Sequence, residues 1–221
     1  MMLPYNLTDI ESWLLQARPW IDELSPVFVK DAPEEAFEQV PLLRQVRRLL
    51  FLISTEGPIK LTATGNLPPA VVRDIYSFGL PEWDVEDYYK SLNTENKSFS
   101  VQLTKLLSLE AKLVRRYKGT LRLTKLAESM LDDPRRILSQ LLFALCTTFN
   151  MGYFDRMDEQ PYVTTAGAFT YLTVARYGSE QRGADFYAGE LLKFRPDWVS
   201  YNTRSQSNIH NLLYPFSKCA L

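Results

Sequence analysis

One short element recurs along the chain and constrains its fold more than any other feature. Each copy has an apolar residue, then a threonine, then glycine or alanine three positions after the threonine. We expect the apolar residue to be buried in a core and the threonine to cap the free N–H groups of the next helix. The small residue should let that helix pack closely against the strand. The copies are Leu61–Gly65, Leu123–Ala127 and Val163–Gly167.

Each copy follows a segment of helical apolar spacing, which gives the order helix, strand, turn, strand, helix of a winged helix, although the first copy lacks a convincing first strand. Threonine-capped joints of this kind also arise by chance in α+β folds. The copies begin at residues 61, 123 and 163, so their spacing of 62 and then 40 residues is too uneven for a solenoid. The sequence therefore predicts a mostly α chain with short β-hairpins, an α+β fold of tandem winged-helix-like modules.

Periodicity, proline and glycine positions place the expected elements and divide the chain. The predicted helices cover 8–24, a short stretch from 33, a stretch from 41, a stretch from 68, 100–109, 125–131, 135–149, 166–177, 184–194 and 205–213. The predicted strands cover 59–62, 112–118, 121–124, 153–154 and 161–164. The predicted domains are an N-terminal helical segment (1–40), a first (41–97) and a second (98–149) winged-helix-like unit, and a third strand-helix unit with C-terminal helices (150–221).

Composition limits the partners. The 221 residues are 46% apolar, enough for a core without disulfides or metal, and the net charge of -1 gives no general attraction to nucleic acid or anionic membranes. The start of the chain lacks a leader pattern, and the apolar stretch 141–146 is too short to span a bilayer, so we expect a cytoplasmic protein without a membrane partner. Cys146 and Cys219 are expected to be free thiols, with a long-range bridge as the alternative.

The sequence argues against nucleophilic catalysis, a zinc site and a phosphate-binding loop. His210 is the only histidine and lies in a polar tail, which leaves no usual base for nucleophilic catalysis. The histidine and the two cysteines are too few and too scattered for a zinc site, and no glycine-rich phosphate loop occurs. We therefore predict no catalytic residues, no metal, no cofactor and no enzymatic activity.

A group of carboxylates leaves one enzymatic alternative open. Glu82, Asp84, Glu86 and Asp87 are candidates for a magnesium or acid/base site. Aromatic and apolar residues alternate with them, so an amphipathic helix start with acids near its positive end is the favoured interpretation.

The most informative cluster is basic, because the segment from residue 111 to 127 contains no acidic residue. Its cations are Lys112, Arg115, Arg116, Lys118, Arg122 and Lys125. On a winged helix they would fall on the hairpin and the following helix start, where a wing can lie along a phosphate backbone. The preceding helix offers Gln102, Thr104 and Lys105 but no arginine to read guanine. An edge hairpin protected from aggregation by its charges, or a protein contact, are the alternatives.

The string Leu61-Thr-Ala-Thr-Gly-Asn-Leu-Pro68, followed by Lys118–Thr124, resembles the C-terminal region of the plasmid Ri-type Orf-three-like family. The resemblance covers roughly residues 40–177 and is specific only in the LTxxGNLP string. It implies a shared fold and transfers no activity. We do not expect the additional N-terminal domain that these relatives often carry.

The sequence thus supports a non-enzymatic regulatory protein that contacts nucleic acid weakly and without sequence preference through a basic wing. The alternative is a protein-interaction module with the same fold and no DNA binding, and a carboxylate-dependent enzyme is the remote one. The structural caps predicted for these modules are Thr62, Thr124 and Thr164.

Overall fold

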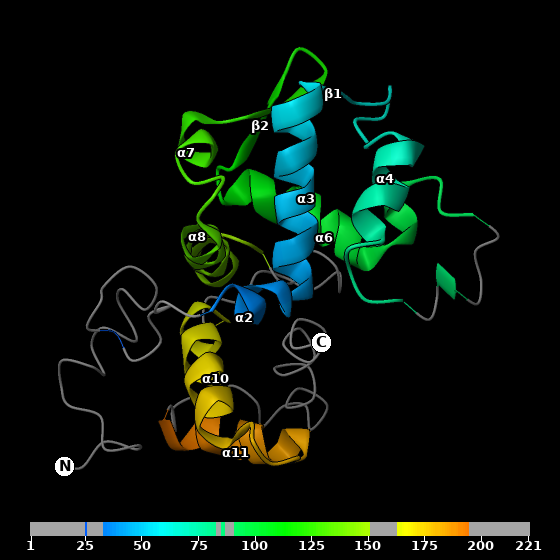
Figure 1. Cartoon of the computed structure of the whole chain (residues 1–221). Helices are drawn as coiled ribbons and strands as arrows, with labels where there is room; N and C mark the ends of the chain where they lie inside the picture. Colours follow the sequence, from blue (N-terminus) through cyan, green and yellow to red (C-terminus); the bar gives the residue numbers. More distant parts are fainter. Residues whose placement is uncertain (1–24, 26–32, 83–84, 87–90, 151–162, 195–221) are drawn as a thin grey trace. The chain divides into compact units, whose positions relative to one another are not determined.

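The computed structural model describes residues 25, 33–82, 85–86, 91–150 and 163–194 (Figure 1). The chain divides into two compact units, Val29–Leu145 on the one hand and Met1–Phe28 with Cys146–Leu221 on the other, and each is described by itself. The described residues are mostly helical and contain one small three-stranded antiparallel sheet, as expected for an α+β fold. Among them, no helix combines the length and apolarity needed to cross a bilayer.

The central helix of the unit Val29–Leu145 is α3 (Pro41–Glu56), which follows the short α2 (Glu34–Glu38). Proline at its first position suits a helix start, because the missing N–H group would have no partner there. Its apolar stripe is buried, with Val46, Leu49 and Ile53 at most 5% exposed. Gln45 is buried on the same helix and donates to the Ile75 carbonyl and to the Ser100 hydroxyl. The helix predicted from residue 41 is thus confirmed, and its apolar stripe lies in the core.

The sheet joins segments that lie far apart in the sequence. Its strands are β1 (Ile59–Lys60), β2 (Val114–Tyr117) and β3 (Thr120–Leu123), in the spatial order β1-β3-β2. The pairing of β1 with β3 aligns Ile59 with Leu121. The predicted units 41–97 and 98–149 therefore contribute strands to one and the same sheet.

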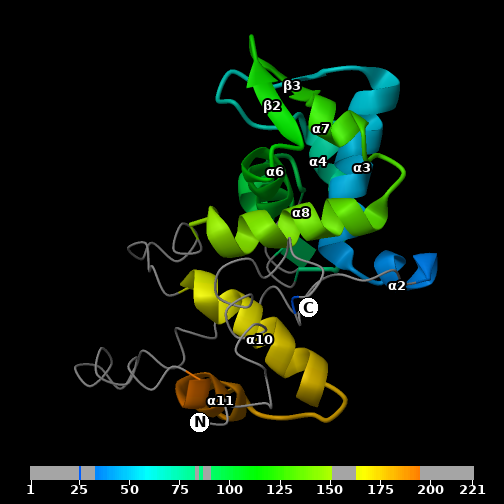
Figure 2. The same ribbon diagram turned by 90° about the vertical axis from the view of Figure 1, so that its left-hand side faces the viewer.

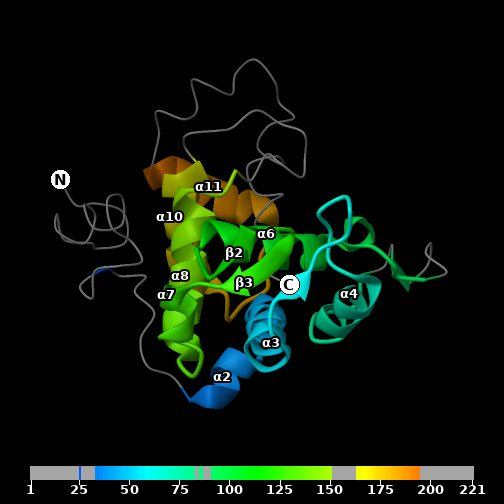
Figure 3. The same ribbon diagram turned by 90° about the horizontal axis from the view of Figure 1, so that it is seen from above.

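Among its described residues, this unit also contains α4 (Pro69–Tyr76), the 3-10 helix η2 (Glu95–Lys97), α6 (Phe99–Glu110), α7 (Lys125–Glu128) and α8 (Pro134–Thr147), the last of which runs two residues beyond the unit. Helix α6 packs against both α3 and α4. Figures 1 and 3 agree that α4 and α8 lie on opposite sides of α3. In Figures 1 and 2 the β2–β3 hairpin extends beyond the helices at one end of the unit. This position leaves the hairpin open to solvent.

The three predicted threonine caps have different outcomes. The prediction for Thr124 is confirmed: its hydroxyl accepts the Ala127 N–H at the start of α7 and donates to the Lys112 carbonyl. The prediction for Thr62 is wrong, because its hydroxyl accepts the N–H of Asn66 and closes a turn well before α4. Two prolines at 68 and 69 set the start of α4 instead.

In the other unit, the described residues form α10 (Val163–Tyr177) and α11 (Ala184–Phe194). The range predicted for α11 is confirmed. Thr164 is a helical residue of α10, so it does not precede the helix as a cap, and residues 163 and 164 do not form the predicted strand. Residues 163–166 contain no glycine or proline, and α10 continues through Gly167, so no residue of this segment delays the start of the helix. The predicted strand 153–154, the helices 8–24 and 205–213, His210 and Cys219 lie outside the described residues.

Candidate nucleic-acid interface

The hairpin is built around a two-residue turn that only certain backbone conformations allow. Lys118 and Gly119 connect β2 to β3, with φ angles of 47° and 71°. Positive φ at both central positions is characteristic of the type I′ turn, whose twist matches that of paired strands, and asparagine-glycine is its preferred sequence. The glycine therefore fits its position, whereas the lysine occupies a conformation that is unfavourable for its side chain.

A second cation occupies a left-handed position at the base of the hairpin. Lys112 has a φ of 55° and follows the C-cap Ala111 of α6. The N–H of Leu113 donates to the Ser108 carbonyl and that of Lys112 to the Leu109 carbonyl, the two bonds of a Schellman motif. Glycine is the usual residue at this point of the motif. Among the described residues, the only non-glycine positions with positive φ are these two lysines.

All six predicted cations lie on the surface of one segment, as the sequence indicated. Lys112, Arg115, Arg116, Lys118 and Lys125 are exposed, and Arg122 is half-buried. Within the described part of the chain, none of the six forms an ion pair with a carboxylate. Carboxylates of the described residues therefore do not balance their charge.

The pairing of the two strands brings like charges together. Arg115 on β2 lies directly opposite Arg122 on β3, on the same face as the neighbouring pair Tyr117 and Thr120. Tyr117 is 42% exposed, and three cations lie near its ring, with Arg115, Lys118 and Arg122 at 5.5, 5.4 and 5.0 Å from the ring centroid. Cation–π attraction to the ring offsets part of the repulsion between the two arginines.

A shallow hollow of about 690 Å³ lies between the end of α6 and the hairpin. Its apolar part comes from Leu106, Leu109 and Val114, and its basic part from Lys112, Arg115 and Arg116 together with the acidic Glu110. The cations of the hairpin therefore continue into a concave surface at its base.

Helix α6, which precedes the hairpin, exposes few side chains that could contact base edges. Of the three residues considered for base contacts, Thr104 and Lys105 are buried and only Gln102 is partly accessible. Thr104 and Lys105 are not available for base contacts, because their side chains contact α3 and the loop before α4. The Thr104 hydroxyl donates to Gln45.

Lys105 forms a buried ion pair that sequence reasoning missed. Its side chain is 2% exposed, and its ammonium lies 2.5 Å from Oε1 of Glu95, whose side chain is 7% exposed. The ammonium also donates to the Gly65 carbonyl at 2.8 Å, while Oε2 of Glu95 accepts the Leu67 N–H at 2.7 Å. The pair thus clamps the loop formed by the string of residues 61–68 onto α6. The only signal in the sequence was a lysine among apolar helical positions.

The acidic stretch supplies helix contacts where the structure describes it. The Glu82 carboxylate accepts the N–H groups of Phe99 and Ser100 at the start of α6, and the hydroxyls of Ser98 and Ser100. Glu86 accepts the Tyr76 hydroxyl. The positive end of a helix stabilises a nearby carboxylate. The helix next to the Glu82 carboxylate is α6, whereas the sequence placed the acids at the start of a helix of their own.

Neither the hollow beside the hairpin nor the hollow along α3 is lined by Glu82 or Glu86. Asp84 and Asp87 lie outside the described residues. Where the structure gives positions, it contains no group of three or more potential metal ligands. Cys146 is buried and belongs to no disulfide within the described ranges.

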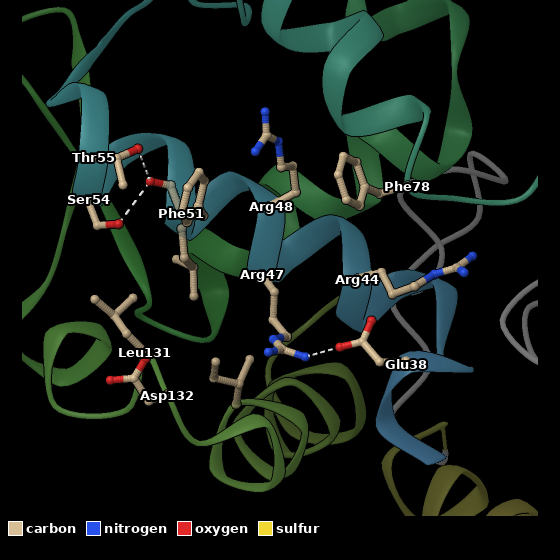
Figure 4. Close-up of a pocket in the computed structure, with 12 residues that line it drawn as sticks. Glu38, Arg44, Arg47, Arg48, Phe51, Ser54, Thr55, Phe78, Leu131 and Asp132 are labelled. Atoms are coloured by element: carbon tan, nitrogen blue, oxygen red, sulfur yellow. Dashed lines mark hydrogen bonds and ion pairs between the residues drawn. The ribbon is translucent and has the colours of Figure 1, made fainter. Parts of the chain in front are cut away.

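A second hollow, of about 460 Å³, runs along α3 and was not foreseen as a site (Figure 4). Arg48 lies between the rings of Phe51 and Phe78, 5.2 Å from each centroid, and its guanidinium is paired with Asp74 at 2.8 Å. Phe51 and Phe78 are 50% and 39% exposed. Arg47 is paired with carboxylates of α2. The sequence indicated this hollow only through the group of arginines on the polar side of α3, which shares that side with a phenylalanine.

Together, the fold and the surface define a small α+β domain with an exposed basic hairpin, whose cations form no ion pair with the carboxylates that the structure describes. Residues 38–136 match the family model described as the Y4jL N-terminal domain, and this range contains the whole of α3, the sheet and α6. No curated protein and no solved structure shows significant similarity to the chain. The resemblance to the plasmid Ri-type Orf-three-like family stays a prediction.

Proposed function

We propose that this chain is a non-enzymatic regulatory protein that binds the phosphate backbone of nucleic acid, without sequence preference, through its β2–β3 hairpin. The observation that carries the proposal is the set of six surface cations on one segment, none of which pairs with a carboxylate among the described residues. Cations clustered in this way release counterions when they meet a polyanion, and this release drives binding.

The conformation of the hairpin supports a functional role for its charges. Lys118 and Lys112 occupy left-handed positions where asparagine or glycine would be more stable. Residues held in unfavourable conformations concentrate at functional sites. Stability alone would also favour a carboxylate opposite Arg115 in place of Arg122. Lys112, Lys118 and Arg122 thus each make the hairpin less stable than the residue favoured at that position would.

The arrangement of elements supports a winged-helix reading of one domain in place of two. The order α3, β1, α4, α6, β2, β3 and the strand order β1-β3-β2 are those of a single winged helix, in which β2 and β3 form the wing. Helix α6 then occupies the recognition position. Because its Thr104 and Lys105 are buried, contact through the wing explains the available surface better than base reading does.

The test is the salt dependence of binding to a fluorescein-labelled random 20-base-pair duplex, measured by fluorescence anisotropy. If all six cations contact phosphates, the logarithm of the binding constant falls with a slope of about −5 against the logarithm of salt concentration. Replacing Arg115, Arg116 and Lys118 by alanine should lower the magnitude of this slope by about 2 to 3. A duplex of scrambled sequence should bind equally well.

The matched control removes three charges elsewhere in the same unit. Arg73→Ala, Lys97→Ala and Arg136→Ala together produce the same net charge as the hairpin variant, and all three residues lie outside the hairpin. This control should keep the wild-type slope. Absence of binding at low salt, or equal slopes for the two variants, would refute the proposal.

A second candidate function, interaction with another copy of the chain, is favoured by the hollow along α3. Aromatic and arginine side chains are enriched in the centres of protein interfaces, and Phe51, Arg48 and Phe78 lie side by side there (Figure 4). Light scattering should then detect a dimer that Phe51→Ser with Phe78→Ser abolishes. Leu80→Ser, at an exposed apolar residue outside the hollow, is the control. A wild-type chain that is monomeric at every concentration contradicts this candidate.

A further inference from the structure

The exposed aromatic ring on the basic hairpin is not needed for phosphate binding. Tyr117 is the last residue of β2, directly before the turn, and the residue is 42% exposed. Its exposure among cations is unusual for a residue that serves only packing, because a large ring stabilises most when it is buried. Tyrosine also carries only two side-chain torsions, so ordering it against a ligand has a small entropic cost.

Three cations lie close to the ring, and one of them is linked by hydrogen bonds to the Tyr117 backbone. Arg122 lies 5.0 Å from the ring centroid, and its Nε donates to the Thr120 hydroxyl at 3.0 Å. That hydroxyl in turn donates to the Tyr117 carbonyl at 2.6 Å. Arg115 and Lys118 lie within 5.5 Å of the same centroid. The result is an exposed aromatic platform within a group of three cations.

Such a platform suits one class of polyanion better than others. Bases in a duplex are stacked on each other, so their faces are not available to a protein ring, whereas the bases of a single strand are. A stacking ring with cations around it binds an unpaired base and the phosphates on either side of it. Heparin and other polyanions without bases gain only from the cations.

We propose that Tyr117 stacks on an unpaired base and that Arg115, Lys118 and Arg122 bind the flanking phosphates, so that single-stranded nucleic acid is the preferred ligand of the hairpin. This inference rests on the proposed function, since it assumes that the hairpin binds nucleic acid. It adds the class of ligand, and it assigns to the tyrosine a role that its neighbours' charges cannot fill.

The experiment separates stacking from charge with two oligonucleotides of the same backbone. Binding of labelled dT20 and of a 20-nucleotide abasic strand is measured by anisotropy at one salt concentration, for the full chain and for Tyr117→Leu and Tyr117→Trp. The wild-type chain should bind dT20 about tenfold more tightly than the abasic strand, as expected for one stacked base. Tyr117→Leu should bind the two equally, and Tyr117→Trp should restore the preference.

Each outcome bears on a different proposal. If the wild-type chain binds neither strand, nor heparin, the proposed function fails and this inference fails with it. If it binds both strands with the same affinity, or if Tyr117→Leu keeps the preference for dT20, phosphate binding stands and the stacking role is overturned. Unchanged heparin retention and far-UV circular dichroism of Tyr117→Leu show that the charges and the fold are intact.

Discussion

Replacing Lys105 by methionine tests whether this lysine acts in the fold or at a binding surface. The substitution keeps the length of the side chain and removes its charge. It leaves the Glu95 carboxylate with the Leu67 N–H as its remaining donor, at a side chain that is 7% exposed, and it deprives the Gly65 carbonyl of a donor at 2.8 Å. Removal of one partner from a buried ion pair costs about 3 to 5 kcal/mol, because the other charge stays buried without compensation.

The measurement is urea unfolding followed by circular dichroism, with a double-mutant cycle. Adding Glu95→Gln to Lys105→Met removes the unpaired charge, while the amide oxygen can still accept the Leu67 N–H. The double variant should therefore recover about 2 kcal/mol or more of the free energy of unfolding. Lys60→Met, at an exposed lysine of β1, is the control and should change stability by less than about 0.5 kcal/mol.

Two results would refute this account. One is a loss of less than about 1 kcal/mol in Lys105→Met, which would mean that the pair is solvated or replaceable. The other is a double variant no more stable than the single one, which would show that the two side chains do not act on each other. The folded double variant should also keep the wild-type salt dependence of duplex binding, because a buried ammonium does not reach a phosphate.

Four further perturbations have expected outcomes. Lys118→Asn should raise the free energy of unfolding by about 0.5 to 1 kcal/mol in urea titrations, because asparagine suits the type I′ turn, and should weaken duplex binding in anisotropy; a loss of stability would contradict the turn assignment. Thr124→Val should cost about 1 to 2 kcal/mol in the same unfolding assay through loss of the α7 cap, and an unchanged midpoint would argue against it. Gly79→Ala should cost about 1 to 3 kcal/mol, since its Cβ would lie 2.4 Å from Nε2 of the buried Gln45; full wild-type stability would show that this amide moves freely. Burial raises the pKa of the Tyr76 hydroxyl above 10.0, so the folded state holds this proton more tightly than the unfolded state, and the stability of the wild-type chain relative to Tyr76→Phe should be constant below pH 10 and fall above it; a pH-independent difference would exclude this linkage.

Local signals in the sequence were sufficient for the hairpin and for several helices. The glycine at 119 between two β-type runs identified the β2–β3 pair, and the cap at Thr124 was recognisable because an apolar strand end and a small residue surround it. The same pattern failed at Thr62, where two prolines delay the helix, and at Thr164, where the helix begins earlier. A pattern of five residues describes a local preference, and its neighbours decide whether that preference is realised.

Contacts between residues far apart in the chain could not be predicted from the sequence. Ile59 pairs with Leu121 across 62 residues, and two alternating strands of two and four residues contain no information on which strand they will join. The prediction of separate modules assigned each strand to its nearest helix for this reason. The burial of Lys105 was equally hidden, because it depends on a carboxylate ten residues earlier that only the packing of the loop brings into contact.

For the candidate site, the composition of one segment was enough to locate the cations. Whether they bind a ligand or only prevent aggregation is argued from the backbone conformation of the residues that carry them. A row of exposed lysines and arginines is compatible with a hairpin that merely avoids aggregation. That explanation requires charges only, and it would be satisfied by residues in relaxed conformations. It does not account for Lys112 and Lys118 at positive φ, nor for Arg115 opposite Arg122, each of which lowers stability without adding solubility. The proposed phosphate contact accounts for all of these at once, because each cation then meets an anion that stabilises the position it occupies.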